Sequence, residues 1–331
     1  MHRRNVVVLG AGVVGLTTAL HLAQSKAYNV TIVAREYTPN TKASDLSGGM
    51  IAYMDIEGPL ARISKAKFKD IAKFDGVRAG VKMTPCHVLY RSKDALEERD
   101  SILKQHPSCR KATKQECRGA KYGFVCNMPV VTMPIYLRYL MDRLKEHGVE
   151  MKRMTVSRLS DVFELFPNTQ IIVNCTGTGS NELADDKDVQ PVAGHMILIE
   201  HNAITLKDYT LYFDEENPGG YTYFMPRADG CIMGGSKQVG VSSQVVNREI
   251  IDGILDRIDK LVPHLKVKKA KILKTWVGLR PSRKSGMRIE LEQTKRGVVI
   301  HNYGHAGVGV SYSWGSAFKV EELIASLSSK L

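Results

Sequence analysis

The sequence contains no long hydrophobic run. No stretch approaches the roughly 18 consecutive apolar residues that a membrane-spanning helix requires, and the N-terminus lacks the hydrophobic region of a secretion signal. Cysteine is also sparse, with six residues in 331, no Cys-x-x-Cys pair and no zinc-finger spacing to histidines. These absences predict no membrane partner and no metal site, and they indicate an intracellular protein whose thiols are free.

Acidic residues are fewer than basic ones, 34 against 47, which gives a net charge of +13. Such a charge is typical of proteins that bind nucleic acid or an acidic membrane surface. However, lysine and arginine are spread along the whole chain, and no basic run is interleaved with aromatic residues, which form only 7% of the chain. We therefore expect a basic solvated surface, helped by an anionic cofactor and substrate, and no nucleic-acid partner.

The composition is that of an ordinary globular protein, with 43% hydrophobic and 24% charged residues. A chain of this length forms one large α/β unit or two domains, and its core needs no disulfide or structural metal.

A glycine fingerprint opens the chain. Residues 5–9 form a short apolar run typical of a buried parallel strand, and Gly10-Ala-Gly-Val-Val-Gly15 follows at once. A helical pattern and a second apolar strand, residues 30–34, complete a β-α-β unit. In this context the glycines predict a dinucleotide site rather than a turn without a ligand, with the phosphates at the helix N-terminus.

Each part of this fingerprint has a predicted task. Gly10 permits the tight turn, Gly12 lets the backbone approach the pyrophosphate, and Gly15 lets the helix pack on the strand. Glu36, at the end of the second strand, can accept hydrogen bonds from a ribose, although Arg35 could face the cofactor instead. The fingerprint alone does not distinguish FAD from NAD.

The remaining elements alternate in type. Periodicity predicts a helix, a buried strand, an antiparallel region, a second helix, a late strand and a final helix after a Gly-rich loop. In order, they occupy residues 133–147, 171–173, 192–275, 247–262, 298–301 and roughly 310–327. The stretch 57–130 shows no clear pattern.

The late segment, 301–309, favours FAD. Its Gly-rich turn precedes a helix, so a second positive helix end near Val310 could stabilise negative charge on a reduced flavin. A chain that returns to its first β-α-β unit in this way fits an FAD fold.

These segments resemble the D-amino-acid oxidase family along nearly the full length. The similar stretches are Val-Val-Val-Leu-Gly-Ala-Gly-Val-Val-Gly-Leu (6–16), Val-Asn-Cys-Thr-Gly (173–177), Gly-Leu-Arg-Pro-Ser-Arg (278–283), Met287-Arg-Ile-Glu290 and His-Asn-Tyr-Gly-His (301–305). The resemblance implies FAD and hydride transfer from a D-amino acid to flavin N5, which leaves an imino acid. Oxygen then reoxidises the flavin to give peroxide, and water hydrolyses the imino acid to a 2-oxo acid and ammonia.

The resemblance also assigns residues. Arg280 matches the arginine that holds the substrate α-carboxylate, which suits a bidentate guanidinium, and Tyr223 matches the active-site tyrosine. Tyr221 faces the same side of a strand, and His301 and His305 are expected to be structural rather than bases. The expected FAD contacts are Gly10, Gly12, Val13, Val14, Gly15, Arg35, Glu36, Ser44, Asp45, Gly48, Gly49, Met50, Val156, Cys175, Thr176, Gly177, Ala306, Gly307, Val308, Gly309, Val310 and Ser311.

Lys237 bears on the choice of substrate. It follows Gly234-Gly235, where the D-aspartate oxidase branch is expected to place a basic residue against the substrate's side-chain carboxylate. A lysine facing a water-excluded pocket would favour an acidic D-amino acid. The alternatives are a solvated Lys237 with neutral D-amino acids as substrates, an oxidase of N-methyl or cyclic amines, and a catalytically silent dinucleotide- or nucleic-acid-binding protein.

Three places depart from the family pattern. Met50-Ile51 lacks the common tryptophan, Pro191-Val-Ala-Gly-His195 stands where Pro-x-Arg-Gly-Gln is usual, and Ala306 replaces a frequent glycine. Each departure concerns the pocket or the loop beside the flavin.

The predicted fold is α/β, with a Rossmann-like FAD-binding domain and an antiparallel-sheet substrate domain. The FAD domain comprises residues 1–56, 130–190 and 276–331, and the substrate domain comprises 57–129 and 191–275. The C-terminal Ser329-Lys330-Leu331 is typical of a peroxisomal address, so we expect the peroxisomal matrix as location and its import receptor as a partner. The other expected partners are a small D-amino acid and oxygen.

Overall fold

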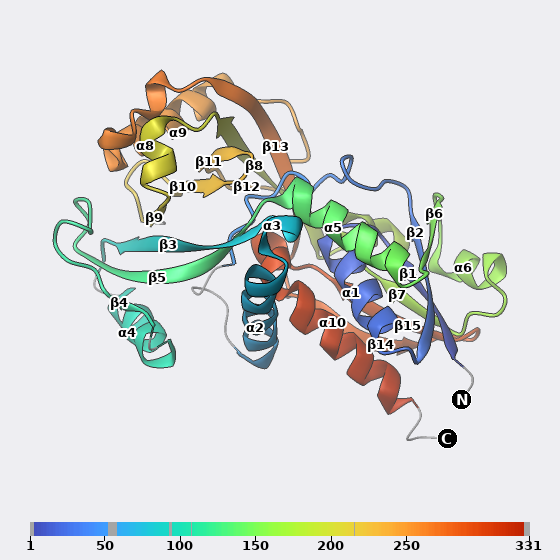
Figure 1. Cartoon of the computed structure of the whole chain (residues 1–331). Helices are drawn as coiled ribbons and strands as arrows, with labels where there is room; N and C mark the ends of the chain where they lie inside the picture. The colour runs from blue at the N-terminus through green and yellow to red at the C-terminus, as the bar shows by residue number, and fades with distance from the viewer. Residues whose placement is uncertain (1–2, 52–57, 93–94, 107, 215, 328–331) are drawn as a thin grey trace.

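Two β-sheets organise the molecule, and each has its own helices (Figure 1). The computed structural model describes residues 3–51, 58–92, 95–106, 108–214 and 216–327. The tripeptide Ser329–Leu331 lies outside these residues, so the peroxisomal address stays a prediction. Among the helices of the described ranges, none combines the length and the apolar character needed to cross a bilayer.

The first sheet has six strands and contains segments from both ends of the chain. Five of them run parallel, and β14 is antiparallel to β15. Their order is β14 (Arg288–Gln293), β15 (Val298–Tyr303), β7 (Ile171–Asn174), β1 (Arg4–Leu9), β2 (Tyr28–Ala34) and β6 (Glu150–Arg153). The predicted strands at 5–9, 30–34, 171–173 and 298–301 are thus confirmed.

Helices cover both faces of this sheet, which explains the unbroken apolar run in β1. Val6 and Val8 pack with α1 (Val13–Gln24), α5 (Met133–Glu146) and α10 (Gly309–Ser326). Val7 and Leu9 point to the opposite face and pack with α6 (Leu159–Leu165). A central parallel strand is buried on both faces, so every position favours an apolar side chain.

The second sheet has nine strands. Neighbouring strands are antiparallel except β3 and β9, which run parallel, so the predicted antiparallel sheet contains one parallel pair. The order is β12 (Gln238–Val239), β8 (Val189–Ile199), β11 (Gly230–Gly234), β10 (Thr222–Arg227), β9 (Leu211–Asp214), β3 (Val81–Tyr90), β5 (Tyr122–Val131) and β4 (Arg110–Lys111), while β13 (Ile272–Arg283) pairs along β8.

The predicted helix over 247–262 is confirmed as α9 (Arg248–Leu261). Ile251, Ile254 and Ile258 lie on one side of α9 and are buried against one face of the nine-stranded sheet. The spacing of three and four residues gives α9 a single apolar stripe. The opposite face of the sheet is therefore left to form the wall of a cavity.

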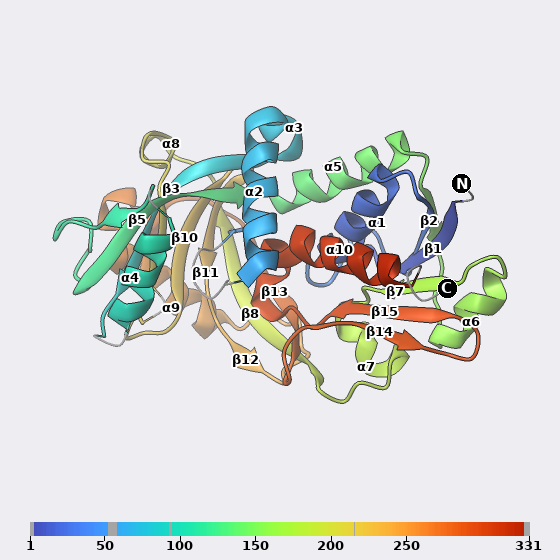
Figure 2. The same ribbon diagram turned by 90° about the horizontal axis from the view of Figure 1, so that it is seen from below.

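The unclear stretch 57–130 contributes helices as well as strands of the second sheet. Its helix α2 (Gly58–Phe74) crosses α10 near the start of α10 (Figure 2), so closely that a Cβ at Gly315 would meet the Leu60 carbonyl oxygen at 2.0 Å. The shorter helices are α3 (Gly76–Ala79), α4 (Ala95–Gln105), α7 (Ser180–Leu183) and α8 (Ala203–Lys207).

Several elements cross the predicted domain boundaries, among them β13 and α2. The whole of β13 belongs to the nine-stranded sheet, although 276–283 was assigned to the FAD domain, and α2 packs on α10 although it was assigned to the substrate domain. The pairing of β13 with β8 and the packing of α2 on α10 decide where these segments belong, and the composition of the sequence does not predict such contacts. The domain division itself stays a prediction.

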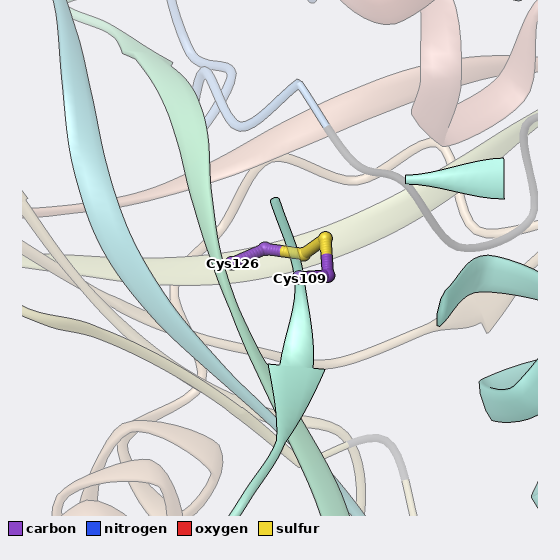
Figure 3. The surroundings of a disulfide bond; sticks show 2 residues. All are labelled: Cys109 and Cys126. Carbon is purple, nitrogen blue, oxygen red and sulfur yellow. A yellow bond between two sulfur atoms is a disulfide. The ribbon is translucent and has the colours of Figure 1, made fainter. Parts of the chain in front are cut away.

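The expectation of six free thiols is wrong for two cysteines. Cys109, just before β4, forms a disulfide with Cys126 of β5, 17 residues further along the chain (Figure 3). Because β4 pairs antiparallel with β5, the two residues lie side by side, with Cα atoms 4.5 Å apart. The other four cysteines, Cys86, Cys117, Cys175 and Cys231, are free and buried.

Candidate FAD and substrate site

A cavity of about 1080 Å³ is lined by both sheets. At one end, which we call the dinucleotide end, it meets the carboxyl ends of β1, β2 and β7, where ligands bind in open parallel sheets. At the other, the substrate end, the face of the nine-stranded sheet forms the wall. The substrate end is lined by Gly194, Met196, Leu211, Phe213, Tyr221, Tyr223, Met225, Lys237 and Arg280.

The fingerprint glycines shape the dinucleotide end. Gly10 has a φ of +100°, and a Cβ there would meet the Cys175 carbonyl oxygen at 2.5 Å. Gly15 does not line the cavity; its missing side chain lets α1 pack on the turn, since a Cβ would lie 2.0 Å from the Gly10 oxygen. Gly12, Val13 and Val14 line the cavity at the start of α1, as predicted.

The N-terminus of α1 faces the cavity without a side-chain cap or an acidic residue in its first turn. The Val13 N–H donates to Ser44 Oγ at 2.9 Å, which ties the loop after β2 to this helix end. The other N–H groups of the first turn and the positive end of the helix dipole make such a site favourable for phosphate.

Arg35 and Glu36 follow β2 and both line the cavity with exposed side chains. Asp45, predicted as an FAD contact, does not line it. Its carboxylate instead accepts the Thr41 N–H at 2.9 Å and the hydroxyls of Thr38 and Thr41. Because these bonds close the loop 38–45 on itself, Asp45 holds the neighbouring Ser44 in place.

The remaining predicted FAD contacts, from four separate segments, line the cavity together. They are Gly48, Gly49 and Met50; Val156; Cys175, Thr176 and Gly177; and Ala306, Gly307, Val308, Gly309, Val310 and Ser311. Burial raises the pKa of the Cys175 thiol to about 12, so this cysteine lines the cavity as a neutral group.

A second helix start lies beside the substrate end. Ala306 opens a 3₁₀ turn with a φ of +48°, and α10 begins at Gly309 with no acidic residue in its first turn. The left-handed conformation costs alanine about 1 kcal/mol and would suit glycine better. Ala306, which stands where the family often has glycine, is therefore a strained residue. Two helix N-termini therefore face one cavity.

His305, directly before this turn, is 2% exposed, and its Nε2 is buried without a hydrogen-bond partner among the described residues. Burial lowers the pKa of His305 to about 4, so the imidazole is neutral near pH 7. A buried polar atom without a partner is costly, and His305 is one of the residues that line the cavity. His301 instead bonds to Glu292 at 2.9 Å and lies 3.4 Å from Asn174, which fits a structural role.

These features fit FAD. The starts of α1 and α10, both rich in glycine, border one cavity, and they offer donors suited to phosphate at the first and to a negatively charged ring edge at the second. Glu36 can accept from a ribose at the dinucleotide end.

Arg280 reaches the substrate end from β13. Its guanidinium is half-buried and Nη1 donates to the Ser236 carbonyl at 3.1 Å. It forms no ion pair with any carboxylate of the described ranges. Gly194 of β8 lies directly beneath, and a Cβ there would be 2.4 Å from Nη1. The guanidinium is therefore held on one side and can bind a carboxylate on the other.

Tyr223 projects from β10 over Gly234, where a Cβ would lie 2.3 Å from the phenolic oxygen. The side chain is buried, and burial raises the pKa of its hydroxyl, an effect that the charge of Arg280 opposes. Tyr223 is thus a neutral phenol that can donate a hydrogen bond near the guanidinium. The structure thus places the two predicted substrate contacts, Arg280 and Tyr223, in one cavity.

Lys237 also lines this cavity, but its side chain is exposed. The premise of a water-excluded lysine is therefore wrong for this structure. The rest of the wall is apolar, formed by Met196, Leu211, Phe213 and Met225, and Tyr221 packs edge-on against Tyr223 with ring centroids 5.5 Å apart.

Sequence reasoning missed Gly194 and Gly234 as site residues. Both are needed because a larger residue would collide with Arg280 or Tyr223. The only signal was their place in glycine-containing segments, which does not reveal the partner side chain. No cluster of three or more His, Cys, Asp or Glu side chains in the described segments could hold a metal ion.

A protein family and several known proteins match this sequence over almost its whole length. The family described as FAD dependent oxidoreductase (DAO) matches residues 5–323. The D-amino-acid oxidase of Rubrobacter xylanophilus is 34% identical over 318 residues, 94% of this chain and 93% of the relative. That of Schizosaccharomyces pombe is 29% identical over 339 residues, 95% of this chain and 94% of the relative.

Solved structures share the fold at low identity. Glycine oxidase from Geobacillus kaustophilus has a TM-score of 0.82 at 19% identity, covering 98% of this chain and 95% of its own. L-proline dehydrogenase from P. horikoshii also has a TM-score of 0.82, at 16% identity, covering 98% and 94%. The chain belongs to the DAO family of FAD-dependent oxidoreductases, and FAD is its cofactor.

Proposed function

We propose that this protein oxidises D-amino acids to 2-oxo acids, ammonia and hydrogen peroxide, and that it prefers acidic ones. The observation that carries the proposal is the guanidinium of Arg280, which has no carboxylate partner in the described part of the chain and lies beside the second helix start of the FAD cavity. D-amino-acid oxidases are also the relatives with 29–34% identity.

The chain's own residues bind and orient the substrate. The guanidinium of Arg280 donates two hydrogen bonds to the α-carboxylate, and the Tyr223 hydroxyl donates a further one to the same group. When bound, FAD supplies two-electron acceptance from the α-carbon and passes the electrons to oxygen. A substrate fixed at its carboxylate presents one face of the α-carbon, so orientation decides which enantiomer reacts.

The acidic preference rests on Lys237. It is the second cation of the substrate end, and no Asp or Glu lines that end among the described residues. A side-chain carboxylate would lie in a positive potential there. Because Lys237 is exposed, its contribution is that of a screened pair, about a two- to fivefold preference.

The apolar wall supports a second candidate, oxidation of neutral D-amino acids. Met196, Met225 and Phe213 would bury an aliphatic side chain, and methionine adapts to several shapes. In this case Lys237 remains solvated and has no influence on substrate choice.

Peroxide release with D-aspartate, D-glutamate, D-alanine and L-aspartate tests both candidates on the purified yellow protein. Lys237→Gln should lower kcat/KM for D-aspartate about two- to fivefold relative to D-alanine, whereas Lys271→Gln, an exposed lysine outside the cavity, should change neither. An unchanged ratio in Lys237→Gln would remove this residue from specificity. No peroxide from any of the four would contradict the proposed activity.

A further inference from the structure

His195 occupies β8 next to Gly194, where the family pattern has glutamine. The residue is 3% exposed, and its backbone N–H and both ring nitrogens have hydrogen-bond partners. Its backbone N–H donates to Ser236 Oγ at 2.8 Å, its Nδ1 lies 3.1 Å from the same oxygen, and the Asn247 backbone N–H donates to its Nε2 at 3.0 Å.

These bonds define the tautomer. A backbone N–H can only donate, so Nε2 must present its lone pair to Asn247. In the neutral ring the proton is then on Nδ1 and is donated to Ser236 Oγ. Burial lowers the pKa of His195, which agrees with a neutral ring.

Ser236 connects this ring to the substrate end. Its side chain accepts from His195, while its carbonyl accepts from Arg280 Nη1 at 3.1 Å. Asn247, the third member, caps α9 by accepting the Glu249 N–H at 2.9 Å. One imidazole thus joins β8, the segment after β11 and the start of α9.

We propose that His195 is a positioning residue that fixes the Ser236 carbonyl and, through it, the guanidinium of Arg280. The inference rests on the proposed function in that Arg280 holds the substrate carboxylate. It goes beyond that function because His195 does not line the cavity and touches no substrate. Without the imidazole, Ser236 keeps the bond from the backbone N–H of residue 195 but loses the bond from Nδ1, so its carbonyl is held less firmly against the guanidinium.

Kinetics of the holoenzyme test the positioning. His195→Leu leaves the Asn247 N–H unpaired and should raise KM about tenfold while kcat changes less than about threefold. His195→Gln should restore KM to within about threefold of the wild type, because its amide both accepts from Asn247 and donates to Ser236. His264→Gln, a histidine bonded to Asp208 away from the cavity, is the matched control and should leave KM unchanged.

Ser236→Ala provides a second variant that retains the carbonyl. It removes the bonds from both the backbone N–H and Nδ1 of residue 195, so it should raise KM at least as much as His195→Leu, and combining the two should add little because the imidazole bond is already absent. Fully multiplicative effects, or a wild-type KM in His195→Leu, would overturn the inference.

The tautomer is measured independently of catalysis. In ¹⁵N-histidine spectra at pH 7, the signals missing from His195→Gln should show a protonated Nδ1 and an unprotonated Nε2. An Nε2–H tautomer would overturn the bridge even in an active enzyme. A wild type that oxidises no amino acid but shows the expected tautomer, with an Nδ1 signal that shifts in Ser236→Ala, would contradict the proposed function and support the bridge.

Discussion

The guanidinium of Arg280 rests on Gly194, and the contact is so close that any side chain at position 194 would displace the guanidinium. A Cβ there would lie 2.4 Å from Nη1 and 2.5 Å from Nη2. Two neighbouring strands, β8 and β13, thereby determine together where a substrate carboxylate can bind. The glycine at position 194 therefore determines where the positive charge of Arg280 lies.

Gly194→Ala should therefore displace Arg280 and raise KM about tenfold or more, while the protein keeps its FAD. Steady-state kinetics with flavin absorbance as the loading check measures this. Gly253→Ala in α9 is the matched control, since its Cβ would meet nothing closer than Arg257 Nη1 at 3.4 Å, and it should leave KM unchanged. Equal effects of the two variants would contradict the contact.

Arg280→Ala should raise KM about 10- to 100-fold because a charge-assisted bond to the substrate is lost. The purified protein should remain yellow, since the dinucleotide end is untouched. Arg296→Ala removes an exposed arginine paired with Glu164 and serves as the control. Wild-type kinetics in Arg280→Ala would remove this residue from carboxylate binding.

His305 makes the fold sensitive to acid. Its pKa is lowered to about 4 in the folded protein, against about 6.5 when unfolded, so the unfolded chain binds the extra proton between these values. Stability is complete above pH 6.5 and is lost as the pH falls towards 4, by about 1.3 kcal/mol between pH 7.5 and 5.5. His305→Gln should reduce the accompanying fall in Tm by about 2 °C.

Other histidines have lowered pKa values too, the half-buried His87 and the buried His301 among them, and they remain in both proteins. The difference between wild type and His305→Gln therefore isolates one group. An identical fall in Tm for both proteins would show that His305 is not held neutral.

The disulfide between Cys109 and Cys126 joins two residues 17 apart in the sequence, at the pair of strands β4 and β5. Chain entropy predicts that its loss costs about 3 kcal/mol, so reductant should lower the urea midpoint of the wild type. The double variant Cys109→Ser, Cys126→Ser should be insensitive to reductant. Thiol titration of the unfolded protein should detect four thiols before reduction and six after.

Local sequence was sufficient for the first β-α-β unit. Apolar runs bounded by glycines predicted β1, α1 and β2, and the fingerprint located the cavity around Gly10, because all of these features arise within about 30 residues. Contacts made between distant strands were not predictable in this way. The pairing of Cys109 with Cys126 needs the register of β4 on β5, and the task of Gly194 needs β13 beside it.

The same limit explains two differences within the site. Sequence indicated that Lys237 borders the pocket but not how deeply it lies, because exposure depends on the segment that follows β11. Asp45 has the residue type and position of a ligand contact, yet hydrogen bonds to Thr38 and Thr41 occupy it. Hydrogen bonds within the turn therefore use the Asp45 carboxylate, which is not free to contact a ligand.

The six-stranded sheet places β15 between β7 and β14, so the last tenth of the chain builds the same site as the first residues. During translation, the glycine fingerprint therefore leaves the ribosome long before residues 302–311 exist to complete the cavity. The nascent chain has to hold an unfinished sheet with an unpaired edge at β7 until synthesis is almost over. A premature stop before residue 298 would remove β15 and α10 and leave no complete cofactor site, however intact the N-terminal unit is.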